Sequence, residues 1–218
     1  MTRTRFLWVI GGCAAFLAAG PAHAGEDFEL WLNPSISYDL DSDTAVKLET
    51  AQRFRSAGND RVDTYFARAW LSQRVAQGLT LSGAVERRVN DGGNDETRLM
   101  QQLTTSHGIL RTRLRLEQRF VDNRDGRMGL RLRPRAGVAI PVTDRLSFGT
   151  DAELFWTLRG TSPGGDTGIT GLRTQAGFDY AITENLEIGL TYLRQQDFED
   201  NGPDEIGHAP LIGVEFAF

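Results

Sequence analysis

The chain has 218 residues, enough for one domain with a substantial core, and its formal net charge is −5. The first 24 residues hold two of the bases and none of the acids, so the remainder carries 22 Lys+Arg against 29 Asp+Glu, a net charge of −7 that gives no support to nucleic-acid binding. The single cysteine, Cys13, also lies in that first stretch, which excludes a disulfide framework or a cysteine metal site from the rest of the chain.

The N-terminus has the three-part pattern of a secretory signal peptide. Two arginines within the first five residues form a basic region, residues 6–20 are uncharged and largely apolar, and Ala22-His23-Ala24 supplies the small residues of a cleavage site. The apolar stretch is too short for a spanning helix. We therefore predict a signal peptide at 1–24, cleaved after Ala24, and one domain at 25–218.

From Gly25 onward, apolar and polar residues alternate in short pieces bounded by turn residues, which indicates β-strands. The clearest piece is 110–120, where leucine, threonine and phenylalanine on one face alternate with arginine and Glu117 on the other. In chain order the expected strands are 28–38, 44–55, 62–75, 79–89, 97–105, 109–121, 128–141, 146–158, 169–181, 186–196 and 208–218.

The connections between these strands are of two kinds, and the two kinds alternate strictly. The short connections are 39–43, 76–78, 106–108, 142–145 and 183–185. The long ones, rich in glycine and acidic residues, are 56–61, 90–96, 122–127, 159–168 and 198–207. Short turns at one end and long loops at the other are typical of outer-membrane barrels, with the short turns in the periplasm. We predict an all-β fold: a transmembrane antiparallel up-and-down β-barrel in the bacterial outer membrane.

A barrel satisfies every backbone hydrogen bond within the protein, as hydrocarbon requires, and only alternate residues need to be apolar. The last strand ends with Ile212, Val214, Phe216 and Phe218 on one face. It resembles the final strand of outer-membrane barrels, whose terminal aromatic is read by the barrel assembly machinery. The expected partners are therefore outer-membrane lipid and, through Phe218, that machinery.

The number of strands raises a difficulty, because bacterial barrels of this kind have even numbers. With Phe218 at the periplasmic end, the alternating turns make segment 28–38 run in the same direction as the last strand. Either 28–38, which contains Pro34, is not a normal spanning strand, or one strand has been missed. We predict ten to twelve strands.

The polar faces of two adjacent strands carry a group of arginines that should form a contiguous basic strip in the lumen. These lumen candidates are Arg111, Arg113, Arg115, Arg119, Arg131, Arg133 and Arg135. Strips of arginine favour the passage of anions. Acids that face inward by the same alternation are Glu49, Glu86, Glu117, Asp151, Glu153, Asp179, Glu187 and Glu215. Two interpretations stay open: a passive channel for small anionic solutes, or a closed structural barrel filled by ion pairs.

A third alternative is a lipid-modifying enzyme, which needs a nucleophile and a base. Only His107 and His208 lie beyond the signal peptide, and neither has the local setting of a barrel lipase or deacylase. We expect no catalytic residue, metal ligand or cofactor.

Trp31, Trp70 and Trp156 are candidates for the aromatic girdles at the membrane interfaces. The phase of segment 62–75 is ambiguous, because Phe66 and Trp70 compete with residues on the opposite face for the lipid side.

The stretch WLNPSISYDLDSDTAVKLETAQRF, from Trp31 onward, resembles an uncharacterised family of bacterial outer-membrane barrels, domain of unknown function 2490. The likeness continues through 65–68 and the arginine strands at 111–119. It implies the fold and the location, with no catalytic signature to carry over. A second, architectural likeness is to the small porins for acidic oligosaccharides, which also have a basic lumen. We expect a monomer without a nucleic-acid partner.

Overall fold

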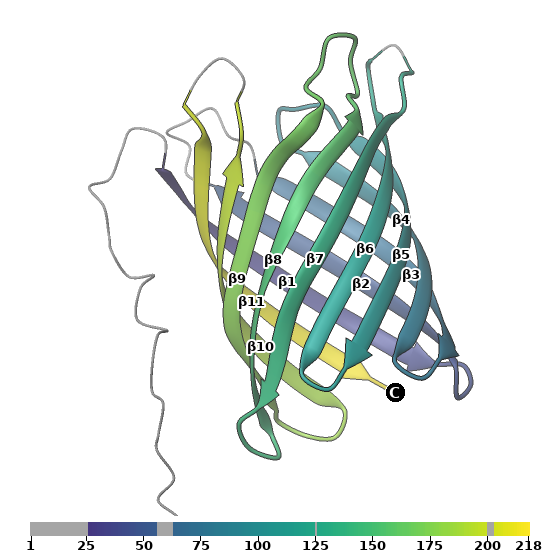
Figure 1. Cartoon of the computed structure of the whole chain (residues 1–218). Helices are drawn as coiled ribbons and strands as arrows, with labels where there is room; N and C mark the ends of the chain where they lie inside the picture. The colour runs from purple at the N-terminus through teal and green to yellow at the C-terminus, as the bar shows by residue number, and fades with distance from the viewer. Residues whose placement is uncertain (1–25, 56–62, 125, 200–202) are drawn as a thin grey trace, which may run out of the picture.

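A computed structural model describes residues 26–55, 63–124, 126–199 and 203–218. The predicted signal peptide at 1–24 and its cleavage after Ala24 lie outside the described residues. The described residues form one closed barrel of tilted strands (Figure 1). Its strands are β1 (Glu26–Asp39), β2 (Thr44–Arg55), β3 (Thr64–Ala76), β4 (Leu79–Asn90), β5 (Glu96–His107), β6 (Leu110–Val121), β7 (Gly129–Pro141), β8 (Leu146–Arg159), β9 (Gly168–Ala181), β10 (Leu186–Asp197) and β11 (Glu205–Ala217).

Each strand pairs with its neighbour in sequence in the antiparallel sense, and β1 closes the barrel against β11. That closing pair is parallel, with Trp31 opposite Leu211 and Ile36 opposite Phe216. An odd number of alternating strands makes the first and the last run in the same direction, so the closure has to be parallel. The predicted up-and-down barrel of ten to twelve strands is confirmed, and segment 28–38 is a full strand of it.

The two ends of the barrel differ, as Figure 1 shows. The short-turn end carries the tight connections and the C-terminus, while the long-loop end carries the longer connections and the start of β1. In the short-turn end the Asp41 side chain accepts hydrogen bonds from the backbone N–H groups of Asp43 (2.8 Å) and Thr44 (2.7 Å). These two bonds lower the pKa of Asp41 and fix the turn between β1 and β2.

The distribution of side chains is inverted relative to that of a water-soluble protein. Large apolar residues cover the outside, such as Leu190 at 59% and Leu48 at 51% exposure. Fourteen polar or charged residues are buried among the described residues against nine apolar ones, so the interior is polar. A search of the described residues for helices with the length and apolar character of a membrane span finds none.

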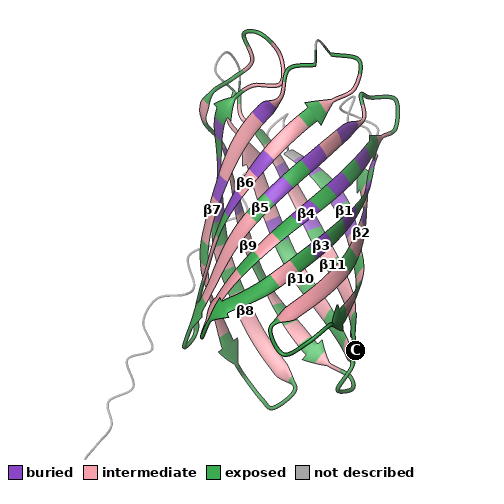
Figure 2. Cartoon of the chain, turned by 90° about the vertical axis from the view of Figure 1, so that its right-hand side faces the viewer, coloured by how far each residue is buried: buried purple, intermediate pink, exposed green. Residues whose placement is uncertain are grey.

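The interior is filled unevenly along its axis. Figure 2 shows the buried positions gathered in the half of the barrel next to the long loops, while the half next to the short turns holds intermediate and exposed positions. Glycines account for part of this difference, because Gly137, Gly149, Gly189 and Gly213 occupy inward positions of β7, β8, β10 and β11. The packed half therefore contains the charged network described below, and the other half is wider.

Two of the three tryptophans considered for the interfacial girdles face the lumen. Trp31 and Trp70 are 4% and 8% exposed, whereas Trp156 is 47% exposed on the outer surface, so the girdle prediction is wrong for the first two. The ambiguous phase of segment 62–75 is resolved in the same way: Phe66 and Trp70 point inward and Tyr65 outward. The reason is that inward aromatics here pack against arginine side chains instead of lipid.

The inward glycines give a test of how tightly the strands pack. A Cβ at Gly137 would collide with the carbonyl oxygen of Thr150 and with Asp151, whose Cα lies 2.8 Å away, whereas a Cβ at Gly213 would meet nothing nearer than the Asn33 carbonyl oxygen at 4.0 Å. We expect Gly137→Ala to lower the free energy of unfolding by roughly 1–3 kcal/mol and Gly213→Ala to leave it nearly unchanged. Urea unfolding of the refolded barrel in lipid vesicles measures both, and equal stability of the two variants would contradict this packing.

Candidate functional site

The arginine strip predicted from the sequence lies on β6 and β7, and the register of these strands brings its members together. Arg113 lies directly opposite Arg135, and Arg115 directly opposite Arg133. Like charges in directly opposed positions of a sheet are destabilising, so this arrangement needs carboxylates nearby.

Glu117 and Glu153 supply that compensation on β6 and β8. Arg133 joins the two, because its Nη1 donates to Glu117 at 2.6 Å and its Nη2 donates to Glu153 at 2.7 Å. Glu153 also accepts from Arg113 and has the Nη1 of Arg173 at 3.7 Å. Both glutamates are almost fully buried, with exposures of 0% and 1%. Among the described residues, removing Glu153 would leave Arg113 and Arg173 without a carboxylate at ion-pair distance, and removing Glu117 would leave Arg115 without one.

A second pair of carboxylates continues the network along β4 and β5. Glu86, which has no exposed surface, pairs with Arg68, with Arg88 at 3.0 Å and with Arg98 at 3.6 Å. Glu96 accepts from Arg98 at 2.7 Å and, on the side of the arginine strip, from Arg119. Because Arg98 also lies 3.9 Å from Glu117, the two halves of the network are joined.

Four lumenal aromatic rings provide flat surfaces for these arginines. The Cζ of Arg53 lies 3.7 Å from the ring centroid of Trp31, Arg133 lies 4.6 Å from that of Phe155, and the other pairs lie within 5.6 Å. The rings are those of Trp31, Phe66, Trp70 and Phe155. Guanidinium groups stack well on such faces, so the rings restrict the arginines to fixed orientations.

Not every arginine is neutralised. Within the part of the chain that the structure describes, no carboxylate lies at ion-pair distance from Arg53 or Arg131. The Nε of each is buried without a hydrogen-bond partner. Both side chains line the central cavity of the lumen, so their charge is presented to whatever occupies that space.

Three hollows follow one another through the barrel. The central one, of about 470 Å³, is lined by eleven arginines and only three acids. It shares Arg131 and Asp197 with an outer hollow of about 300 Å³ beneath the long loops. It shares Arg113 and Arg135 with an inner hollow of about 360 Å³, which also contains Gly137 and Gly149. The seven predicted lumen residues therefore border one succession of spaces, from Arg119 in the outer hollow to Arg111 in the inner one.

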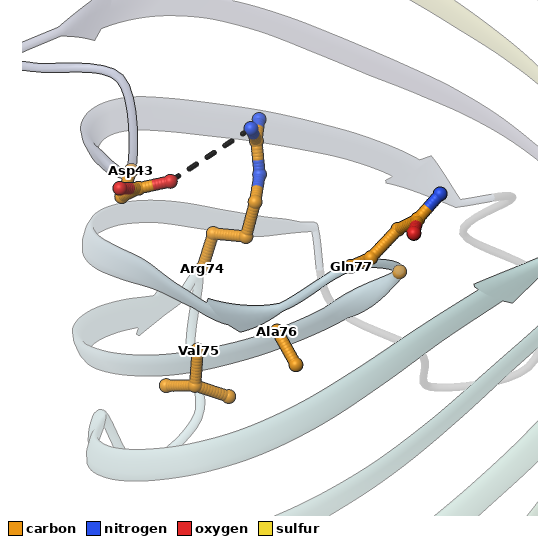
Figure 3. Close-up of a pocket in the computed structure, with 6 residues that line it drawn as sticks. Asp43, Arg74, Val75, Ala76 and Gln77 are labelled. Carbon is orange, nitrogen blue, oxygen red and sulfur yellow. Dashed lines mark ion pairs between the residues drawn. The ribbon is translucent and has the colours of Figure 1, made fainter.

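A further pocket lies at the rim where β3 turns into β4 (Figure 3). Its charged groups are Asp43 and Arg74, which form one ion pair of 3.9 Å, with side-chain exposures of 52% and 61%. Such exposed pairs contribute little to stability, and this pocket contains one of them, whereas eleven arginines line the central hollow of the lumen. We therefore place the candidate site in the lumen.

The two histidines lie apart from the lumen. His107 is exposed at the end of β5, next to the short turn to β6. His208 faces outward on β11, where its ring stacks between Phe28 and Tyr192 and its Nδ1 shares a hydrogen bond with the Tyr192 hydroxyl. Among the described residues, no group of three or more His, Cys, Asp or Glu is arranged to hold a metal ion.

At the long-loop end, Arg87 connects two loops from the outer face of β4. Its guanidinium donates to Asp122 at 2.7 Å and to Asp95 at 3.0 Å. The hydrogen bond from Arg87 lowers the pKa of Asp122, so this connection persists in mild acid. The outer hollow is also bordered by a loop contact, in which Arg124 donates to Thr161 at 2.8 Å.

Sequence reasoning missed the aromatic rings and the glutamines of the site. Phe155 lies between Glu153 and Thr157 on the polar face of β8, so its phase could have placed it in the lumen. Gln102 accepts two hydrogen bonds from Arg115, and Gln195 accepts two from Arg173. The sequence does not indicate the role of these glutamines, because uncharged polar residues occur on both faces of this barrel.

Fold and lumen together define an outer-membrane-type β-barrel with a charged, partly filled lumen. The barrel is similar to the crystal structure of the NanC porin, with a TM-score of 0.56 and 12% sequence identity over 88% of this chain and 99% of that one. A second membrane-protein structure, from a study of in-meso crystallisation, aligns with a TM-score of 0.44, 11% identity and coverage of 82% and 78%. No curated protein matches the sequence.

The family model described as protein of unknown function DUF2490 matches residues 28–206. The chain belongs to this family.

The network predicts a strong dependence of stability on single buried carboxylates. We expect Glu117→Gln to lower the free energy of unfolding by roughly 3–5 kcal/mol, because Arg133 loses one of its two buried counter-ions and Arg115 loses the carboxylate at 3.9 Å. Glu184→Gln, in the exposed turn between β9 and β10, is the matched control and should change it by less than about 0.5 kcal/mol. The measurement is urea unfolding in lipid vesicles, and a Glu117→Gln barrel as stable as the control would show that the network is not required.

Proposed function

We propose that this protein is a passive channel of the bacterial outer membrane that passes small anionic solutes through its arginine-lined lumen. The observation that carries the proposal is a set of three hollows that border common arginines, Arg131 between two of them and Arg113 and Arg135 between the other two. Arginine outnumbers acid by eleven to three around the central hollow, which favours anions over cations. Its volume of about 470 Å³ limits the solute to a small molecule.

The buried carboxylates are consistent with this role. Glu117 and Glu153 accept hydrogen bonds from Arg133 of the strip and hold it in place, while Arg53 and Arg131 keep unpaired charge at the cavity. The same carboxylates support the second candidate, a closed structural barrel, because ion pairs this well buried can fill a lumen. A measurement of conductance distinguishes the channel from the closed barrel.

The first measurement is the conductance and reversal potential of the refolded protein in a planar bilayer under a salt gradient. We expect steady steps whose reversal potential shows anion selectivity. If protein that is folded by circular dichroism gives no conductance, this result would contradict the channel and favour the closed barrel.

Arg131 is the arginine to replace, because neutralising it leaves no buried carboxylate without its counter-ion. We expect Arg131→Gln to reduce the ratio of anion to cation permeability severalfold, since the charge between the outer and central hollows is lost. Arg145→Gln, in the exposed turn between β7 and β8, removes the same charge away from the hollows and should leave the ratio unchanged. Equal selectivity of both variants and the unmodified protein would overturn the role given to the strip.

The inner hollow offers an independent test of the path. A Cβ at Gly149 has its nearest neighbour at 3.8 Å, and a Cβ at Gly83, on the outer face of β4, at 3.9 Å, so both sites accept a Cβ without collision. We expect Gly149→Leu to lower the single-channel conductance because the leucine occupies the inner hollow, and Gly83→Leu to leave it unchanged. A conductance unaffected by Gly149→Leu would mean that ions do not pass through this space.

A further inference from the structure

Arg53, on the wall of the lumen away from the arginine strip, has a setting unlike that of its neighbours. Its guanidinium lies over Trp31, with Cζ 3.7 Å from the ring centroid, and the ring centroid of Phe66 lies 5.4 Å away. Its Nε is buried without a hydrogen-bond partner, and no carboxylate among the described residues is at ion-pair distance. An aromatic face, and not a counter-ion, therefore holds this cation in place.

The carboxylates near Arg53 are committed to other arginines. Glu29 lies 3.1 Å from Arg55, and Glu86 pairs with Arg68 and Arg88. Glu29 also accepts a hydrogen bond from the indole N–H of Trp31, which fixes the plane of the ring on which Arg53 rests. The guanidinium is thus oriented in advance, while its charge stays available to the cavity.

The position of Arg53 separates it from the arginine strip. Around the barrel, β2 lies five strands from β7 in one direction and six in the other, so Arg53 faces Arg131 and Arg133 across the central hollow. Arg173 is the second cation at this wall, because its Cζ lies 5.0 Å from the centroid of the same Trp31 ring. Arg173 is oriented by Gln195, and among the described residues its one carboxylate at ion-pair distance is Glu153, at 3.7 Å.

We propose that Arg53, with Trp31 as its platform and Arg173 beside it, forms an oxyanion-binding site for the carboxylate or phosphate group of a small solute. A guanidinium presents its N–H groups as a planar fork that matches two oxygens of such a group at once, whereas a halide ion offers a single centre. The fork is already oriented by Trp31, so little rotamer entropy is lost when the oxyanion binds. The site therefore prefers oxyanions to chloride.

The test is an equilibrium titration of the full, refolded protein in detergent, which does not depend on conduction. Sodium acetate, sodium phosphate and sodium chloride are added at matched ionic strength while tryptophan fluorescence is recorded. We expect acetate and phosphate to change the emission at about tenfold lower concentration than chloride, the effect of one additional hydrogen bond to a charged group. Trp31→Phe keeps an aromatic platform but removes the reporter, so the response should disappear in that variant.

Two substitutions of Arg53 distinguish the contribution of the planar guanidinium geometry from that of the positive charge. Arg53→Lys keeps the positive charge and should bring the acetate-to-chloride and phosphate-to-chloride preferences close to one, while Arg53→Gln should abolish the response. Arg145→Gln is the matched control and should behave like the unmodified protein, and circular dichroism confirms that each variant is folded. Equal responses to chloride and oxyanions, a preference that survives Arg53→Lys, or a response that survives Trp31→Phe would each overturn the proposal. If the protein shows no conductance in the bilayer but its fluorescence responds preferentially to oxyanions, the channel is refuted and the binding site is supported.

Discussion

The buried ion pairs between arginines and glutamates are the interaction on which the rest of this structure depends. Without carboxylates nearby, the directly opposed arginines on β6 and β7 would repel one another. Glu117 and Glu153 make the arrangement possible because each is shared by several guanidinium groups. Sharing leaves more arginine than acid at the cavity, so the same interaction that stabilises the barrel also gives the lumen its positive character.

Like the carboxylates, the aromatic rings hold the lumenal arginines in place. A carboxylate neutralises an arginine, while Trp31 orients Arg53, and Phe155 lies beside Arg131, without removing the charge. Several guanidinium groups, such as that of Arg133, have both a carboxylate and a ring, whereas those of Arg53 and Arg131 have a ring and, among the described residues, no carboxylate at ion-pair distance. The paired groups give the lumen rigidity, and the unpaired ones leave positive charge at the cavity.

Closure of the sheet decides which side of each strand becomes interior. In a closed barrel alternate residues face lipid and lumen, so a single strand such as β6 places leucines outside and arginines inside over its whole length. The parallel pairing of β1 with β11 follows from the odd strand number and brings Trp31 into the lumen beside β2. The Arg53 site accordingly depends on β1, because this strand carries Trp31. The sequence analysis did not decide whether β1 is a normal spanning strand.

The sequence by itself determined the class of fold, the positions of the strands and the inward direction of the arginines, because a period of two and the alternation of short and long connections are local properties. It did not determine which arginine meets which carboxylate, since Arg113 and Glu153 are 40 residues apart and their contact depends on the register across β6, β7 and β8. Nor did it place Trp31 and Trp70, because an aromatic ring suits both a lipid interface and an arginine-lined lumen. Only the closed barrel decided between these environments, by fixing on which side of the sheet each ring lies.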